Sequence, residues 1–211
     1  QGSLLNDRKQ RERLTQFIEL CAQRDIETWA LLGEPEWLKS GGTKAVAQAI
    51  SRVRDFNALF GAFEPKIAGI KLDLEPHSQP GWNEGGAARE ALETNWLNLL
   101  QTARDNSKGA LPLWADLPVK LFQPEEQPLL DRAAELLDGA TLMDYFNAEK
   151  PITERADAAL RVFEKPLEIG LELSPKAPAE DTLAGWPPDR VRSLRESLNV
   201  FLAGHDNFAG L

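Results

Sequence analysis

Two carboxylates two positions apart close an apolar segment in the first half of the chain. Asp73 and Glu75 follow the run Ile67-Ala68-Gly69-Ile70 and come directly before Pro76. Side chains alternate between the two faces of a β-strand, so both acids would share one face with Lys71. Proline cannot donate a ladder hydrogen bond, and Pro76 therefore marks the edge of the strand. Acids at the carboxyl end of a buried strand indicate a candidate catalytic site.

The rest of the chain must supply the elements that position this pair. Asn6 or Asp7 can cap a first helix that runs to about Arg24, and Thr43 can cap a second helix that runs to about Phe63. A buried strand is expected between them, at 28–33. The pattern then repeats, with strands expected at 66–75, 111–117, 140–146 and 167–173, and helices at about 87–106, 125–138, 152–164 and 188–203. This alternation predicts an α/β fold with parallel strands and right-handed helical crossovers.

The positions of polar residues favour a parallel (β/α) barrel over an open sheet. Nearly every expected strand carries a polar residue at its carboxyl end, which fits one rim site built from many strands. No glycine-rich phosphate loop supports a dinucleotide crevice, and no cofactor is expected. These rim residues are Glu34, Glu75, Asp116, Asp144 or Tyr145, and Glu172.

A full barrel has eight strands, whereas this sequence provides about six. The last of them, at 207–211, repeats the form of 66–70 but stops where matching carboxylates would come. We therefore expect residues 1–211 to form one barrel domain that lacks the first strands and the end of the last one. A complete six-stranded open sheet is the alternative.

The segment Ala68-Gly69-Ile70-Lys71-Leu72-Asp73-Leu74-Glu75 resembles the fourth-strand signature of family 18 glycoside hydrolases, Asp-Gly-x-Asp-x-Asp-x-Glu. Gly69, Asp73 and Glu75 match that signature, and Met143-Asp144-Tyr145 is similar to the Met-x-Tyr of the sixth strand. The resemblance implies that Glu75 protonates the glycosidic oxygen, with Asp73 as its partner. It also implies that Tyr145 stabilises the reacting acetamido group.

Glu75-Pro76 and Glu172 also resemble the acid and nucleophile of the retaining barrel glycosidases that carry Asn-Glu-Pro. That resemblance implies a carboxyl separation of about 5–5.5 Å between Glu75 and Glu172. In either scheme one acid must stay protonated, and Asp73 favours this because two neighbouring carboxylates resist joint ionisation.

Tryptophans at or just past the expected strand ends are candidates for substrate binding, because flat aromatic faces stack on the apolar faces of sugar rings. The loops at 76–86 and 174–187 are expected to form the walls of a cleft. The candidate substrate contacts are Trp37, Trp82, Trp114, Trp186, Asp116, Asp144, His77 and Glu34.

Composition limits the possible partners. The net charge of -9 argues against nucleic acid, and no apolar run is long enough to span a bilayer. Cys21 is the only cysteine, and its helical pattern indicates a buried structural thiol. The compartment and the oligomeric state are left open.

The sequence thus predicts a glycoside hydrolase that acts on a poly- or oligosaccharide with Glu75 as general acid. Two alternatives remain. Lys71 beside Asp73 fits a carbohydrate-binding barrel that has lost catalysis. The spacing of Asp73, Glu75 and His77 also fits a metal-dependent lyase or phosphodiesterase, although no metal is expected because Pro76 breaks the strand.

Overall fold

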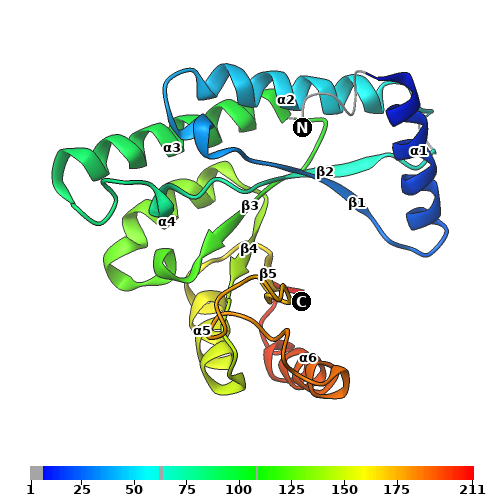
Figure 1. Ribbon diagram of the computed structural model, residues 1–211. Helices are drawn as coiled ribbons and strands as arrows, with labels where there is room; N and C mark the ends of the chain where they lie inside the picture. Colours follow the sequence, from blue (N-terminus) through cyan, green and yellow to red (C-terminus); the bar gives the residue numbers. More distant parts are fainter. Residues whose placement is uncertain (1–6, 62–63, 108) are drawn as a thin grey trace. The chain divides into compact units, whose positions relative to one another are not determined.

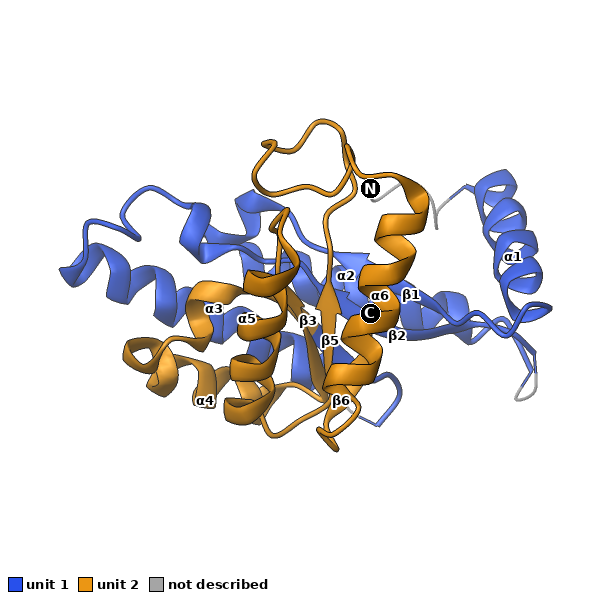
Figure 2. Ribbon diagram, turned by 90° about the horizontal axis from the view of Figure 1, so that it is seen from below, with its two compact units in different colours: residues 1–114 blue, residues 115–211 orange. Residues whose placement is uncertain are grey.

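The computed structural model describes residues 7–61, 64–107 and 109–211, in which strands and helices alternate along the chain (Figure 1). The chain divides into two compact units, residues 1–114 and 115–211 (Figure 2). Each unit carries part of the predicted set of site residues.

Unit 1 contains two parallel strands and the start of a third. Strand β1 pairs with β2 so that Trp29 lies opposite Gly69 and Leu32 opposite Leu72. The amide of Ile70 donates to the carbonyl of Pro112, just before β3. The elements of this unit are α1 (Arg8–Ala22), β1 (Thr28–Leu32), η1 (Pro35–Leu38), α2 (Gly42–Asn57), β2 (Ile67–Leu72), η2 (Pro76–Ser78) and α3 (Gly86–Ser107), and β3 (Leu113–Pro118) crosses into unit 2.

Helix α2 shows how the apolar pattern produces the core of unit 1. Val46, Ile50, Val53 and Phe56 recur at helical spacing and are all buried, and α2 packs along α3 (Figure 1). The apolar face of α2 therefore packs against both the strands of unit 1 and α3.

The bounds of α2 differ from those expected. Gly41, at a positive φ of 89°, precedes the helix in place of a Thr43 cap. The helix ends at Asn57, whose side-chain amide bonds both the N–H and the C=O of Ile67 at the start of β2. The expected end at Phe63 lies outside the described residues, as does Asn6 of the first predicted cap. Asp7 does cap α1, through a bond from the amide of Gln10.

Unit 2 continues the alternation with parallel strands. Strand β4 pairs with β5, with Ala140 opposite Leu167 and Met143 opposite Gly170, and β5 pairs with β6. The elements of this unit after β3 are η3 (Val119–Phe122), η4 (Pro124–Glu126), α4 (Gln127–Leu136), β4 (Gly139–Met143), α5 (Glu149–Val162), β5 (Leu167–Gly170), α6 (Pro188–Leu202) and β6 (Phe208–Gly210).

These pairings confirm the predicted α/β class with parallel strands. Six strands alternate with helices, and the strands that the structure describes do not close into a barrel. None of the helices in the described ranges is both long and apolar enough to cross a membrane. Cys21 is a free thiol on α1, half-buried rather than buried as expected, because this part of α1 is partly open to solvent.

The strands that carry the predicted site residues are shorter than expected. Strand β2 ends at Leu72, β4 at Met143 and β5 at Gly170, so the candidate acids follow the strands instead of ending them. The alternation nevertheless continues, because Leu72 and Leu74 are buried whereas Asp73 and Glu75 are half-buried. Both acids thus keep the shared face that the spacing predicts.

Candidate active site

Asp73 and Glu75 lie just beyond the carboxyl end of β2, held by the backbone of β1. The amide of Asp73 donates to the carbonyl of Leu32 at 2.9 Å, which extends the strand pairing by one residue. Gly33 makes this possible, because a Cβ atom at residue 33 would lie 1.9 Å from the carbonyl oxygen of Asp73. The position of Asp73 therefore depends on a glycine that directly follows the neighbouring strand.

A tight turn fixes the backbone on the other side of Glu75. The carbonyl of Glu75 accepts hydrogen bonds from the amide of Ser78 at 3.2 Å and from the Ser78 hydroxyl at 2.8 Å. Pro76 begins the short helix η2. The backbone carbonyl of Glu75 is thus hydrogen-bonded within the turn. These bonds fix the backbone of Glu75, and with it the start of its side chain, at the beginning of the loop.

Both carboxyl groups favour their protonated forms more than ordinary acids do. Burial raises the pKa of Asp73, and the charge of His77 opposes this rise. Burial also raises the pKa of Glu75, and the neighbouring charge of Asp73 raises that pKa further. One oxygen of Asp73, Oδ1, is buried and makes no hydrogen bond to the part of the protein that the structure describes. A raised pKa favours the protonated form that an acid needs in order to deliver a proton.

Aromatic rings pack against β2 near the pair. The ring of Trp29 lies against Gly69, where a Cβ atom would lie 2.3 Å from a ring carbon. Trp114 meets Trp29 edge to face with 5.6 Å between ring centroids, and the Lys71 ammonium lies 5.6 Å from the Trp114 ring centroid. Gly69 therefore provides the room for this aromatic cluster.

Glu34 and Trp37 follow β1. Both are half-buried, and the amide of Trp37 donates to the carbonyl of Glu34 at 2.9 Å in the turn of η1. Gly42 lies against this turn, because a Cβ atom there would lie 1.7 Å from the carbonyl oxygen of Trp37. Both residues remain candidates for substrate contact.

Trp82 has a different environment from the one expected for a sugar platform. Only 1 % of it is exposed, and the guanidinium of Arg89 lies 4.6 Å from the centroid of its ring. The ring packs the 76–86 loop onto α3 and presents no open face in this structure, because core residues and Arg89 surround it. We therefore assign it a packing role.

In unit 2, Asp144 faces the helix layer. It is fully buried, and its Oδ1 lies 3.5 Å from Nη1 of Arg155 on α5. Burial raises the pKa of Asp144 to about 7 even though the Arg155 charge lowers it. Arg155 also stacks on the ring of Phe146, 4.5 Å from its centroid. Asp144, a predicted substrate contact, is thus buried beside Arg155 in this structure.

Tyr145, the next residue of this segment, is 38 % exposed. Its ring lies beside Gly170, since a Cβ atom at that glycine would be 3.8 Å from the tyrosine Cε1 atom. Asp116 is half-buried on β3. Asp144 is therefore buried, whereas the neighbouring Tyr145 is exposed.

Glu172 organises the long loop between β5 and α6. Its carboxylate accepts a hydrogen bond from the amide of Ser174, and its carbonyl accepts bonds from Leu183 N at 2.9 Å and Thr182 Oγ1 at 3.2 Å. The candidate nucleophile thus has a structural partner within its own loop. On the same strand, the Glu168 carboxylate accepts a bond from the Thr141 hydroxyl at 3.1 Å.

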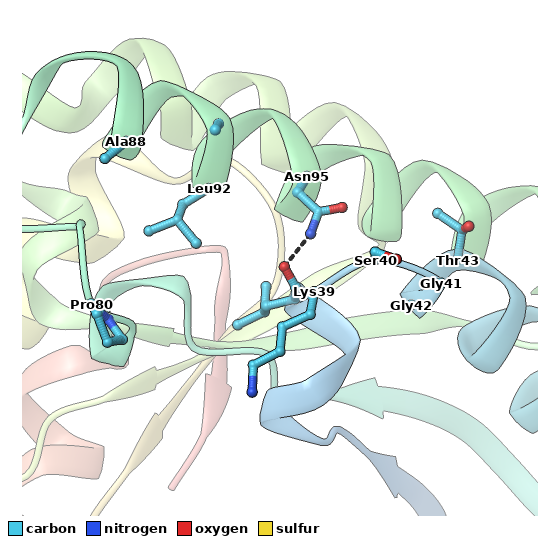
Figure 3. Close-up of a pocket in the computed structure, with 11 residues that line it drawn as sticks. Lys39, Ser40, Gly41, Gly42, Thr43, Pro80, Ala88, Leu92 and Asn95 are labelled. Carbon is cyan, nitrogen blue, oxygen red and sulfur yellow. Dashed lines mark hydrogen bonds between the residues drawn. The ribbon is translucent and has the colours of Figure 1, made fainter.

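Two cavities lie near the carboxyl ends of strands. In unit 1, a cavity of about 460 Å³ opens between the start of α2 and α3, with Asn95 bonded to the Leu38 carbonyl at its wall (Figure 3). Neither Asp73 nor Glu75 lines it. In unit 2, a cavity of about 430 Å³ is lined by Asn147, Trp186 and the loop before Trp186.

No group of three or more histidine, cysteine or acidic side chains in the described ranges is arranged to hold a metal ion. His77 lies on η2, half-buried, and its interaction with Asp73 is electrostatic. Its place beside the acid pair keeps it in the candidate site.

No protein-family model matches the chain, and neither does any curated protein. Among solved structures, the chain is similar to a GH26 beta-mannanase from Bacteroides ovatus, BoMan26A, with a TM-score of 0.46 and 18 % identity over 79 % of this chain and 58 % of that chain. It is also similar to the group II chitinase catalytic domain 2 of Ostrinia furnacalis, with a TM-score of 0.40 and 16 % identity over 78 % of this chain and 49 % of that chain. The chain therefore spans about half the length of these two structures.

Sequence reasoning missed three residues that position candidate residues or a cavity within their own unit: Gly33 in unit 1, and Arg155 and Asn147 in unit 2. Gly33 carried a signal, because a glycine at a strand end indicates a close backbone approach. Arg155 and Asn147 carried no such signal, since an arginine on a helix and an asparagine in a loop are ordinary surface residues until their partners are known.

Proposed function

We propose that the chain is a glycosidase-type hydrolase in which Glu75 is the general acid and Asp73 its charged partner. The observation that carries this proposal is the pair itself, two half-buried carboxyl groups with raised pKa values just past a buried strand. The substrate is a poly- or oligosaccharide.

Glycoside hydrolysis requires a proton for the leaving oxygen and a negative group near the positive charge that develops at the sugar carbon. In the proposed reaction the Glu75 proton moves to the glycosidic oxygen as its bond to the anomeric carbon breaks. Water then adds to that carbon and returns a proton to Glu75. The charge of Asp73 favours the protonated form of Glu75.

The structure supports the acid pair more strongly than it supports Glu172. The Glu172 carboxylate already accepts a backbone hydrogen bond, whereas Asp73 Oδ1 accepts none from the described protein. We therefore favour the scheme in which Asp73 and Glu75 act together, with Glu172 as the anchor of its own loop.

The direct test is hydrolysis of chitin, β-mannan and cellulose oligosaccharides by the unaltered chain and by Glu75→Gln. Glutamine keeps the shape of glutamate but has no proton to give, so we expect turnover to fall at least a hundredfold. Glu84→Gln is the matched control, because Glu84 is an exposed glutamate on the same loop. Equal rates for the chain and for Glu75→Gln would refute the proposal.

The second candidate function is a carbohydrate-binding module without catalysis. It is favoured by Lys71, whose ammonium lies by the Trp114 ring on the face that also carries Asp73. Calorimetry distinguishes the two functions. Oligosaccharide binding by the unaltered chain, with no reducing sugar released over a day, would favour the binding module.

A further inference from the structure

The cavity of unit 2 belongs to a loop that is already folded around it. Its walls come from residues 175–186 of the β5–α6 loop and from Asn147, which follows β4. Its volume of about 430 Å³ falls within the range typical of small-molecule sites, roughly 300–1,000 Å³. Cavities at the carboxyl ends of parallel strands are the usual ligand sites of α/β proteins.

Hydrogen bonds hold this loop in one conformation. Thr182 Oγ1 bonds the carbonyls of Glu172 and Ser174 and accepts from the amide of Ala184. Asn147 fastens the loop to the end of β4, because its amide donates to Glu180 O at 3.0 Å and its Nδ2 donates to Ala179 O at 2.7 Å. A preorganised cavity of this kind loses little conformational entropy on binding.

Trp186 is fixed at the edge of the cavity. Its amide donates to the carbonyl of Leu183 at 2.9 Å, and the guanidinium of Arg190 lies 3.4 Å from the ring centroid on one face. The cation restrains the ring by a cation–π contact. Trp186 also lines the cavity and is half-buried, so a ligand in the cavity would contact it.

The lining residues specify the chemistry of that ligand. None of the eight residues that line the cavity has an ionisable side chain, and most are small and apolar. Asn147 keeps one N–H and its side-chain carbonyl oxygen for further hydrogen bonds, since only one of its N–H groups is used by Ala179. An uncharged ligand with one flat apolar face and several hydroxyl groups matches an indole ring beside an amide.

We propose that this cavity binds one sugar ring of a neutral carbohydrate, with Trp186 as the stacking surface and Asn147 as the hydrogen-bonding group. The choice of a carbohydrate rests on the proposed function. The site itself consists of residues that take no part in the acid–base step, so binding and hydrolysis can be tested separately.

The test measures calorimetric affinities of hexasaccharides of chitin, β-mannan and cellulose for the Glu75→Gln chain, which should bind without turnover. One or more of the three sugars should bind. For that sugar, we expect Trp186→Ala to lower the affinity by at least tenfold. Ala184→Leu, which fills the cavity and keeps the indole, should do the same. Lys176→Ala is the matched control, because Lys176 is exposed on the same loop and does not line the cavity.

The outcomes separate the two proposals. Tight binding that depends on Trp186 and Ala184, together with no hydrolysis of any of the three sugars by the unaltered chain, supports the sugar site in the cavity and refutes the proposed hydrolysis. The proposal that the cavity binds a sugar is overturned if none of the three sugars binds. It is also overturned if both cavity variants bind with unchanged affinity. If Trp186→Ala lowers the unfolding temperature and thereby loses the loop, Ala184→Leu decides the question.

Discussion

The carbonyl oxygen of Asp73 occupies the space where residue 33 would carry a Cβ atom. A Cβ on Gly33 would lie 1.9 Å from that oxygen and 2.7 Å from the carbonyl carbon, so the two backbones are in direct contact. The amide of Asp73 donates to Leu32 O in the same region. The geometry of the candidate acid pair thus depends on Gly33, the residue directly after β1, which has no side chain.

Gly33→Ala should therefore disturb both stability and activity. The clash is with backbone, which cannot rotate away, and overpacking of this kind typically costs 1–3 kcal/mol. We expect a lower urea midpoint of unfolding and, in the folded fraction, a lower rate of hydrolysis because Asp73 is displaced. Gly204→Ala is the control, since a Cβ there would meet nothing within 4 Å. Equal midpoints for the two variants would contradict the close approach.

Gly69→Ala tests the packing of Trp29 in the same way. An added methyl group would lie 2.3 Å from the Trp29 ring, which is itself held by Trp114. We expect a loss of about 1–3 kcal/mol of stability in the unaltered background. In a Trp29→Ala background the same substitution should cost much less, because the clashing ring is gone. A double-mutant cycle of urea denaturations measures this coupling, and additive costs would disprove it.

The fold class could be predicted because it depends on repeated local patterns. The apolar stripe of α2 and the run at Ile67 specify a buried helix and a buried strand from their spacing alone. The shared face of Asp73 and Glu75 also follows from the period of two. Strand ends could not be predicted, since β2 stops at Leu72 where its pairing with β1 ends, four residues before Pro76.

The environments of individual site residues depend on partners distant in sequence, which no local pattern specifies. Trp82 and Trp186 both fall in proline- and glycine-rich loops, yet the first is buried beside Arg89 and the second lines a cavity. Asp144 and Tyr145 differ for a similar reason, because Arg155 on α5 gives only Asp144 a buried partner.

Asp73→Asn should move the pH profile of the proposed reaction. Glu75 must be protonated to act as the acid, so activity is lost as pH rises through its raised pKa. Removal of the Asp73 charge lowers the pKa of Glu75, because burial and that charge are the two causes that raise this pKa. We expect the alkaline limb of kcat/KM to shift to lower pH. An unmoved limb, measured with an aryl glycoside, would mean that Asp73 and Glu75 are not coupled.

Glu172→Gln distinguishes a loop anchor from a nucleophile. Glutamine retains a side-chain oxygen that can accept the Ser174 amide bond, whereas it cannot form a glycosyl intermediate. If Glu172 is the anchor, Glu172→Gln keeps activity within about threefold, and Glu172→Ala loosens the loop. Limited proteolysis at 171–187 checks the loop. Loss of turnover in Glu172→Gln with an intact loop would restore Glu172 as the nucleophile.

The buried Asp144 predicts a pH dependence of stability with a definite sign. Its pKa is about 7 in the folded state and near 3.8 when exposed, so the folded chain binds more protons between these values. Stability therefore falls as pH rises from about 4 to about 7, by up to roughly 4 kcal/mol for a shift of this size. Asp144→Asn abolishes this titration while it keeps the shape of the side chain. We expect the unfolding free energy of Asp144→Asn, measured in urea, to rise relative to the unaltered chain between pH 5 and pH 8. Parallel pH curves for the two chains would show that the Arg155 charge already compensates for the burial of Asp144.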